Sequence, residues 1–291
     1  MTLPTNTASQ ISLRVPPQMW FVVSAIFHYL GPAFAALLFV QIGVLGVAWF
    51  RIASAAAIFA IWVKPWRLLR NAPRQILILL VLLGACLAIM NSTFYLAIAR
   101  LPLSLVATIE FLGVLVLALA GVRAPRNVAA VALAGFGVYL QTKLHWSSDM
   151  LGLLYAVVNA LLFMAYIMLG HRIARAGAAD GVERLGAAMA LAFVFVMPIG
   201  FWEAWPALAN PLLVLAGIGV GICSSVIPYV CDQFAMARLP RNTFALMLAL
   251  LPATATVIGA LVLAQIPNLQ ELAGIALVMV GIILHRPNET A

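Results

Sequence analysis

Apolar runs of about membrane length dominate the sequence, separated by short polar or basic connections. Hydrophobic residues fill 65% of 291 positions, charged residues fill 8%, and the mean hydropathy is +1.12, a composition outside the range of soluble domains. Because backbone groups in lipid must hydrogen-bond within their own segment, and a spanning helix needs about 20 residues, the sequence predicts an all-α integral membrane protein with ten transmembrane helices. The predicted spans are residues 18–40, 43–63, 75–99, 103–121, 127–142, 151–170, 185–202, 211–236, 243–264 and 270–285.

Ten such spans use most of the chain and leave no room for a soluble domain, so the function is expected inside the helix bundle. The first apolar run is too long for a signal-peptide core and has no small-residue cleavage site after it, so we expect it to be retained as the first helix. Residues 1–17 and 286–291 are predicted to be short tails.

The basic residues lie at the span ends, which sets the predicted orientation. With the N-terminus inside, the inner connections hold thirteen basic residues: Arg14, Lys64, Arg67, Arg70, Arg74, Arg123, Arg126, Arg172, Arg175, Arg184, Arg238, Arg241 and Arg286. The outer connections hold only Arg100 and Lys143. This bias predicts that both termini are cytoplasmic. It also accounts for the net charge of +8 without nucleic-acid binding, which we do not expect.

A short internal repeat divides the chain into two halves. The sequence Ala-Arg-Leu-Pro occurs at 99–102 and again at 237–240, between the third and fourth spans and between the eighth and ninth. The two predicted halves, residues 18–142 and 150–285, each contain five spans. Since five is odd, the halves enter the membrane in opposite senses, which is the inverted repeat typical of alternating-access transporters.

Several motifs resemble the drug/metabolite transporter superfamily, and within it the EamA-type threonine/homoserine exporter branch. They are Lys64-Pro65-Trp66-Arg67, Met90-Asn91 with Phe94-Tyr95-Leu96, Ile109-Glu110-Phe111, Ile227-Pro228-Tyr229, Ala237-Arg238-Leu239-Pro240 and Thr243-Phe244. The resemblance covers nearly the whole chain. It implies ten helices in two inverted halves and export of a small metabolite across the inner membrane.

The chain departs from that pattern at three places. A Glu-Pro pair is common in the ninth helix of such exporters, but this chain has Leu251-Pro252, and a Gly-Glu pair that often ends that helix is replaced by Ala264-Gln265. Val114 occupies the first-half counterpart of Pro252. Glu110 is therefore left as the one mid-membrane carboxylate of the fourth and ninth spans.

Glu110 is the first candidate functional residue. A charged side chain near the middle of a spanning helix costs roughly 2.5–3.5 kcal/mol on insertion scales, so it usually faces a wet cavity, a partner or a proton path. We expect Glu110 to exchange a proton for the transported solute, so protons are candidate partners of the chain.

Polar and aromatic side chains recur at helical spacing in three other spans. Ser225, Tyr229 and Asp232 share one stripe beside Pro228, which together with Pro252 is a candidate kink; Asn91 and Tyr95 form a second stripe; Tyr155, Asn159, Phe163 and Tyr166 form a third. Such stripes suit a cavity wall that binds a zwitterion or an organic cation. They are equally typical of packing between membrane helices, and the sequence leaves both interpretations open.

Two basic side chains fall inside spans. Arg51, near the middle of the second span, is expected to pair with Glu110, to anchor its helix, or to bind a substrate carboxylate. His28, with Ser24 one turn earlier, is either a pH-sensitive group or a hydrogen-bonded bystander. The sequence does not decide between these roles.

The sequence holds no phosphate-binding loop, no catalytic signature and no metal-ligand cluster, so no cofactor and no enzyme activity is expected. Its three cysteines, Cys86, Cys223 and Cys231, lie in apolar segments and predict no disulfide framework.

The predicted function is export of small polar metabolites, above all amino acids. Two alternatives stay open: export of organic cations or drugs on the same fold, and a non-transport membrane enzyme or subunit. Glycines at 135, 137, 274 and 281 permit close helix packing within one chain or in a homodimer.

Overall fold

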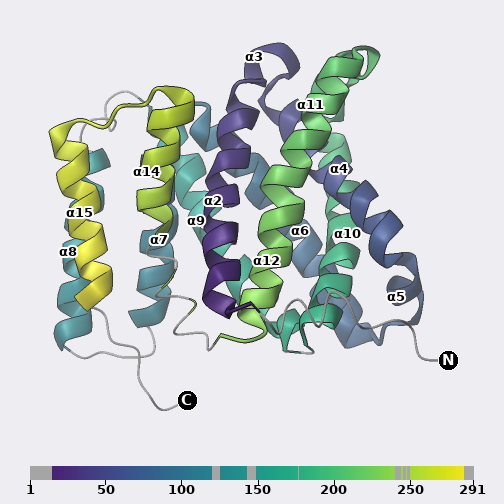
Figure 1. Ribbon diagram of the computed structural model, residues 1–291, viewed down its shortest axis with the longest axis horizontal. Helices are drawn as coiled ribbons and strands as arrows, with labels where there is room; N and C mark the ends of the chain where they lie inside the picture. The colour runs from purple at the N-terminus through teal and green to yellow at the C-terminus, as the bar shows by residue number, and fades with distance from the viewer. Residues whose placement is uncertain are drawn as a thin grey trace. The chain divides into compact units, whose positions relative to one another are not determined.

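The computed structural model describes residues 15–119, 125–142, 149–175, 177–239, 244, 247 and 250–284, and every regular element in these ranges is helical (Figure 1). The elements up to the middle of the chain are α2 (Pro17–Ala36), α3 (Phe39–Ile42), α4 (Val44–Val63), α5 (Trp66–Asn71), α6 (Arg74–Ile98), α7 (Leu103–Leu119) and α8 (Pro125–Thr142). They are followed by α9 (Met150–Ala174), α10 (Ala178–Ala204), η1 (Trp205–Ala209), α11 (Pro211–Gly221), η2 (Ile222–Val226), α12 (Ile227–Met236), α14 (Leu250–Leu263) and α15 (Leu269–Leu284).

Some predicted features fall outside the described residues. These are nearly all of both tails, Pro240, Thr243 and the basic residues Arg14, Arg123, Lys143, Arg241 and Arg286.

Six helical stretches are long and apolar enough to cross a membrane: Pro17–Ala36, Val44–Val63, Arg74–Ile98, Met150–Ala174, Asp180–Ala209 and Pro211–Met236. These helices carry large exposed apolar side chains, such as Ile61 of α4, which is 81% exposed. The shorter apolar helix α14 does so too, with Leu261 80% exposed. Such exposure is costly in water and ordinary in lipid. The structure therefore agrees with an all-α integral membrane protein that crosses the bilayer several times.

Two predicted spans are interrupted. The span predicted at 18–40 ends as α2 at Ala36, and the short α3 follows before Gly43, whose φ of +86° favours glycine. The span predicted at 211–236 is divided by the π-helical turn η2. A turn of this kind widens the helix by one residue, and hydropathy alone does not reveal it because every residue around it remains apolar or small.

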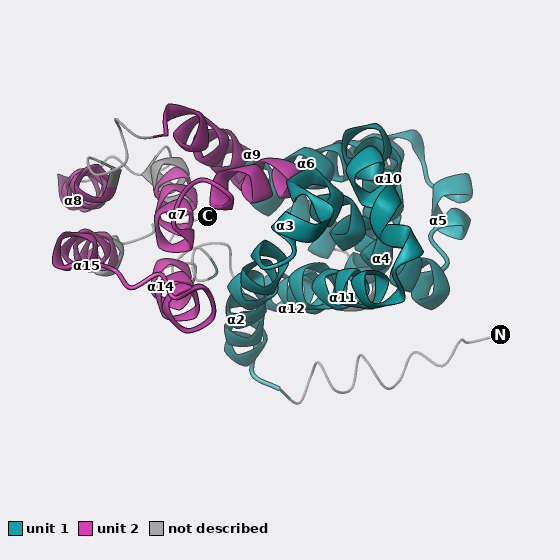
Figure 2. Ribbon diagram, turned by 90° about the horizontal axis from the view of Figure 1, so that it is seen from above, with its two compact units in different colours: residues 1–89, 165–244 teal, residues 90–164, 245–291 magenta. Residues whose placement is uncertain are grey.

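The chain forms two compact units, coloured separately in Figure 2. Unit 1 contains residues 1–89 and 165–244, and unit 2 contains residues 90–164 and 245–291. The chain passes from one unit to the other within α6 and within α9. Each unit thus takes segments from both predicted halves of the sequence.

In unit 1, α4 packs against α10 along glycines. A side chain at Gly200 would meet the Leu45 carbonyl oxygen, and a Cβ at Gly46 would lie 3.0 Å from the Ala204 nitrogen. The Glu203 carboxylate, near the end of α10, accepts hydrogen bonds from the backbone N–H groups of Leu45 at 2.9 Å and Gly46 at 3.1 Å. It satisfies donors at the N-terminus of α4 that have no partner within the helix.

In unit 2, α8 and α15 pack closely and cap each other. Arg126, at the start of α8, donates from Nε to the Leu284 carbonyl at the end of α15, at 2.7 Å. Gln270, at the start of α15, donates from Nε2 to the Leu140 carbonyl near the end of α8, at 2.8 Å. The two helices are therefore antiparallel, and each supplies a donor for the C-terminal carbonyls of the other.

Glycines bring the same two helices together. A Cβ at Gly274 would lie 2.7 Å from the Gly137 carbonyl oxygen, and a Cβ at Gly281 would lie 2.6 Å from the Ala130 carbonyl oxygen. Gly135, by contrast, has open space around it. Three of the four predicted packing glycines are thus used within the chain.

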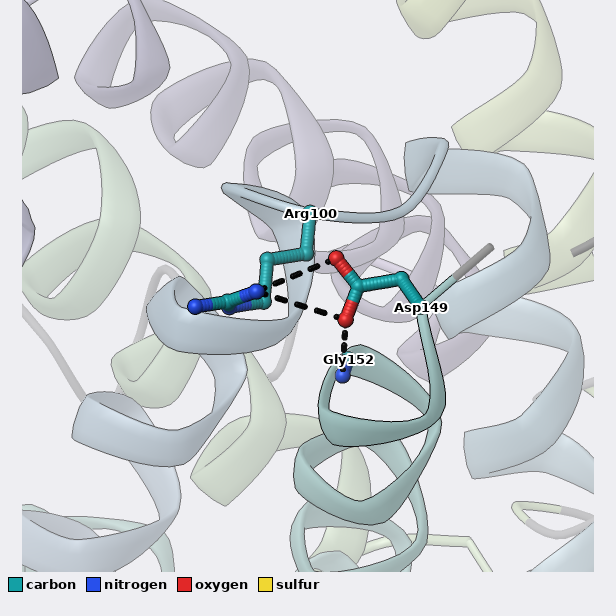
Figure 3. A network of polar contacts seen from close by, with 3 residues as sticks. All are labelled: Arg100, Asp149 and Gly152. Carbon is teal, nitrogen blue, oxygen red and sulfur yellow. Dashed lines mark hydrogen bonds and ion pairs between the residues drawn. The ribbon is translucent and has the colours of Figure 1, made fainter. Parts of the chain in front are cut away.

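An ion pair joins the α6–α7 connection to the start of α9 (Figure 3). Arg100 Nη1 lies 3.1 Å from Asp149 Oδ2, and the Gly152 N–H donates to Asp149 Oδ1 at 2.8 Å. The Gly152 hydrogen bond and the Arg100 guanidinium hold the pKa of Asp149 below its ordinary value. Asp149 therefore stays ionised and acts as the N-terminal cap of α9.

Candidate functional site

Arg51 lies in the middle of α4 and is only 2% exposed. Its Nε donates to Ser225 Oγ at 2.9 Å, and its Nη2 donates to the Ser224 carbonyl oxygen at 2.6 Å and to Tyr229 Oη at 3.3 Å. The guanidinium carbon also lies 5.9 Å from the centre of the Tyr229 ring. These contacts tie α4 to the segment where η2 meets α12.

The sequence around Pro228 explains why a carbonyl is available to Arg51. Proline has no N–H, so Pro228 cannot donate to the carbonyl of Ser224, four residues earlier. Ser224 belongs to the π turn and is fully buried. The Ser224 carbonyl instead accepts a hydrogen bond from Arg51.

Glycines allow these helices to approach. A Cβ at Gly31 on α2 would clash with the Ser224 hydroxyl, and a Cβ at Gly221 would clash with the Ser54 hydroxyl of α4. Both glycines lie in helices, where they cost about 1 kcal/mol relative to alanine. Their positions show that the site depends on backbone contact between α2, α4 and the π turn.

Asp232, one turn beyond Tyr229 on α12, is buried as well. Its Oδ1 accepts a hydrogen bond from Ser24 Oγ of α2 at 2.5 Å, and its Oδ2 accepts one from Tyr166 Oη of α9 at 2.8 Å. Arg238, six residues later, donates to the Val15 carbonyl at 2.7 Å. Asp232 is thus held inside unit 1.

We call Arg51, Asp232 and their hydrogen-bond partners the Arg–Asp cluster; the partners are Ser24, Tyr166, Ser224, Ser225 and Tyr229. The Tyr166 and Tyr229 rings lie 5.3 Å apart at their centres. His28 lies on the edge of the cluster, with its ring 6.4 Å from that of Tyr229. Unit 1 therefore brings together Arg51, Ser225, Tyr229, Asp232 and His28 from the predicted candidates.

Unit 2 contains a second buried polar contact. Asn159 of α9 donates from Nδ2 to Glu110 Oε1 of α7 at 2.6 Å, and both side chains are buried. Among the residues that the structure describes, the Asn159 Oδ1 atom has no hydrogen-bond partner. A buried acceptor of this kind is costly unless a donor reaches it, so the Asn159 carbonyl oxygen is an acceptor for a further donor.

The other candidates of unit 2 lie on α6 and α9. Asn91 and Tyr95 are buried, and Tyr155 is half-buried. Arg51 belongs to unit 1 and Glu110 to unit 2, and each has hydrogen-bond partners in its own unit. Pro252 lies in the first turn of α14, directly beyond residues that are not described, so its role as a kink stays a prediction.

Sequence reasoning missed several buried polar residues. Gln233, on α12, is fully buried and neither amide atom has a hydrogen-bond partner among the described residues. A Cβ at Gly181 would lie 2.9 Å from its Oε1. Ser224 was missed too, although its position four residues before Pro228 is a signal that a sequence provides. No such signal marks Gln233, because its surroundings come from α9 and α10.

Comparison with known proteins places the chain among transporters. Residues 150–286 match the EamA-like transporter family. The chain is 33% identical over 252 residues to the threonine/homoserine exporter RhtA of Salmonella typhimurium, covering 85% of this chain and 84% of that protein. It is 34% identical over 238 residues to RhtA of Escherichia coli strain K12, covering 81% and 79%. One crystal structure shares the fold with a TM-score of 0.59 at 19% identity, covering 92% of this chain and 95% of that one.

Proposed function

The chain belongs to the EamA-like transporter family, and we propose that it is an inner-membrane secondary transporter that exports small polar metabolites, with amino acids such as threonine or homoserine as its cargo. The observation that carries this proposal is the sequence identity of 33–34% with the threonine/homoserine exporters RhtA over most of the chain. Buried polar clusters in both units give it a physical basis, because such groups in membrane helices mark solute and ion pathways.

We further propose ten transmembrane helices in two inverted five-helix repeats that rock around a central site, with both termini in the cytoplasm. The reciprocal contacts of α8 and α15 support this architecture. Arg126 and Gln270 are 144 residues apart, as are the carbonyls of Leu140 and Leu284 that they cap. The packing glycines Gly137 and Gly281 are separated by the same 144 residues. The same separation of 144 residues therefore relates both the capping hydrogen bonds and the packing glycines of α8 and α15, as expected for two copies of a repeat.

Coupling is assigned to Glu110. In this proposal the carboxylate binds a proton or the solute, and the two compete for the same oxygens. The Asn159 amide donates a hydrogen bond to this carboxylate at 2.6 Å, and the Asn159 carbonyl oxygen offers an acceptor beside it. An ammonium group has three donors and no acceptor, so it suits this pair of oxygens.

Counterflow in proteoliposomes tests the proposal. Vesicles holding purified protein are loaded with an unlabelled solute, and uptake of the same labelled solute is followed for threonine, homoserine, organic cations and purines. Accumulation of threonine or homoserine supports the proposal, whereas a folded protein that accumulates neither contradicts it. Glu110→Gln should abolish the pH dependence of counterflow. Glu183→Gln, which removes a half-buried carboxylate near the start of α10, is the matched control and should retain it.

Export of organic cations is the second candidate function. A buried carboxylate beside two tyrosine rings, as Asp232 lies beside Tyr166 and Tyr229, is a general means of holding a cation. The same counterflow panel separates the two candidates, because this alternative predicts accumulation of quaternary ammonium compounds and none of threonine.

A further inference from the structure

The connection from α4 to α6 carries a dense group of basic side chains. We call them the basic patch: Lys64, Arg67, Arg70 and Arg74. All four are exposed, and none forms an ion pair or a side-chain hydrogen bond with another described residue. Arg100, Arg126 and Arg238, by contrast, each bond to a group of the protein. The charge of the basic patch is therefore available to a group from outside the chain.

The segment that carries the basic patch is folded. Lys64 ends α4 in the left-handed conformation, with a φ of +50°, and the buried Pro65 precedes α5. Asn71 Nδ2 donates to the Arg67 carbonyl at 3.0 Å, and α5 packs against α10 at the margin of unit 1 (Figure 2). Residues three apart on a helix have Cβ atoms about 5–6 Å apart. Arg67 and Arg70 are therefore placed to reach one phosphate group together.

Tryptophans indicate the depth of this segment in a bilayer. Trp62 and Trp66 are exposed beside the basic patch, and Trp202 and Trp205 are exposed near the other end of α4. Tryptophan is enriched at both membrane–water interfaces. The 20 residues of α4 extend about 30 Å, which is the thickness of the hydrocarbon core. The basic patch therefore lies at the level of the lipid headgroups.

The two ends of the α4–α10 pair differ in charge. The end with Trp202 and Trp205 carries only Glu203, whose carboxylate is bonded to backbone N–H groups of α4. At the other end, the start of α10 adds Asp180, Glu183 and Arg184. Within the described chain, no ion pair joins these three residues to the basic patch. A positive charge in excess of the acidic residues thus remains at one interface, beside aromatic side chains.

We propose that the basic patch, with Trp62 and Trp66, is a binding site for the headgroup of an anionic phospholipid. The planar guanidinium groups of Arg67 and Arg70 match the oxygens of a phosphate, and clustered basic residues directly after a spanning helix attract anionic lipids. The tryptophan rings pack against the glycerol and the first acyl carbons. This inference goes beyond the proposed export and holds for any transported solute. The orientation of the chain requires only charge, whereas a lipid site also requires this folded arrangement.

Two lipids with the same acyl chains test the site. Phosphatidylglycerol has an uncompensated phosphate charge, whereas the choline group of phosphatidylcholine neutralises it. Binding of each lipid to the purified full chain in neutral detergent is measured by native mass spectrometry. The wild type should bind phosphatidylglycerol at least about tenfold more tightly, and this preference should shrink as ionic strength rises. Inorganic phosphate at equal concentration should not displace the lipid, because it has no apolar part.

Removal of two charges should remove the preference. The double variant Arg67→Gln/Arg70→Gln should bind phosphatidylglycerol about tenfold more weakly and phosphatidylcholine as before. Its lipid-free melting temperature should equal that of the wild type, because both side chains are exposed and have no partner among the described residues. The matched control is Arg172→Gln/Arg175→Gln, which removes two exposed arginines three residues apart in unit 1 and should keep the preference.

The apolar half of the site has its own variant. Trp66→Ala should weaken the binding of both lipids by a similar factor, whereas Trp205→Ala, at the other end of α4, should leave the preference unchanged. Should the double variant melt lower than the wild type, the single variants Arg67→Gln and Arg70→Gln should each show a smaller loss.

Three results would overturn the inference. A wild type that binds both lipids equally has no anionic-lipid site. Equal losses in the two double variants would mean that lipid follows the overall charge and not the basic patch. Displacement by inorganic phosphate would mean that the patch binds free anions. None of these results bears on the exporter proposal, which counterflow of threonine tests separately.

Discussion

Asn159 donates a hydrogen bond of 2.6 Å to Glu110, and its own carbonyl oxygen has no partner among the described residues. The two side chains come from α9 and α7 and are both buried. Hydrogen bonds to charged groups contribute about 1.5–3 kcal/mol. The contact therefore joins α7 to α9 within unit 2 by a hydrogen bond of the stronger kind.

We expect Asn159→Ala to lower the free energy of unfolding by about 2 kcal/mol, because the buried carboxylate loses the hydrogen bond from the Asn159 amide. The double variant with Glu110→Gln should lose less than the sum of the two single variants, since no charge is left without its partner. Unfolding of the purified protein in mixed micelles measures all three. Additive losses would show that the hydrogen bond contributes nothing.

Gly274→Ala and Gly281→Ala should each destabilise the protein by about 1–3 kcal/mol, because the added methyl group meets a backbone carbonyl oxygen of α8. Gly135→Ala is the matched control, with open space at its Cβ position. It should be neutral or stabilising by up to about 1 kcal/mol, through helix propensity alone. Equal melting temperatures for all three variants would argue against close contact between α8 and α15.

Pro228→Ala restores an N–H that is able to bond the Ser224 carbonyl, and so competes with Arg51 for that oxygen. We expect counterflow to fall several-fold, while the free energy of unfolding stays the same or rises, because proline inside a helix costs about 3 kcal/mol. A variant that transports normally would show that transport does not require the hydrogen bond from Arg51 to the Ser224 carbonyl.

Gln233→Met replaces a fully buried amide that has no hydrogen-bond partner among the described residues. An unsatisfied buried polar group costs about 1–3 kcal/mol, so the free energy of unfolding should rise by about 1 kcal/mol. The melting temperature of the purified variant measures this. A clear fall instead would mean that the amide is satisfied by bound water, as buried polar groups often are.

Asp149 contributes to stability in a pH-dependent way. Its pKa is lowered by the Gly152 N–H and by Arg100, so its stabilisation is complete above the ordinary aspartate pKa of about 3.9 and is lost as the pH falls through the lower, folded-state value. The melting-temperature difference between wild type and Asp149→Asn should therefore be constant from pH 7 to pH 5 and shrink below pH 4. Arg100→Gln should have the smaller effect, because the backbone hydrogen bond is the larger cause.

The positions of the helices were largely predictable. Hydropathy is a property of each segment by itself, so the runs that form α4, α6 and α9 predict those helices to within a few residues. Helical spacing likewise placed Ser225, Tyr229 and Asp232 on one face. The π turn at Ile222–Val226 was not predictable, because it depends on what α2 and α4 place beside the Ser224 carbonyl.

The partners of the charged residues depended on tertiary structure. The sequence left Arg51 three roles: pairing with Glu110, anchoring its helix, or binding a substrate carboxylate. In the structure it donates to Ser225, Ser224 and Tyr229, all more than 170 residues away in the chain. Ser24, placed near His28 by spacing, donates to Asp232 across 208 positions.

The sequence by itself determined which segments are apolar helices and which polar side chains share a helix face, because both follow from local periodicity. Only the tertiary structure decided which faces meet, because that depends on close contacts, many of them at glycines, that no single segment encodes.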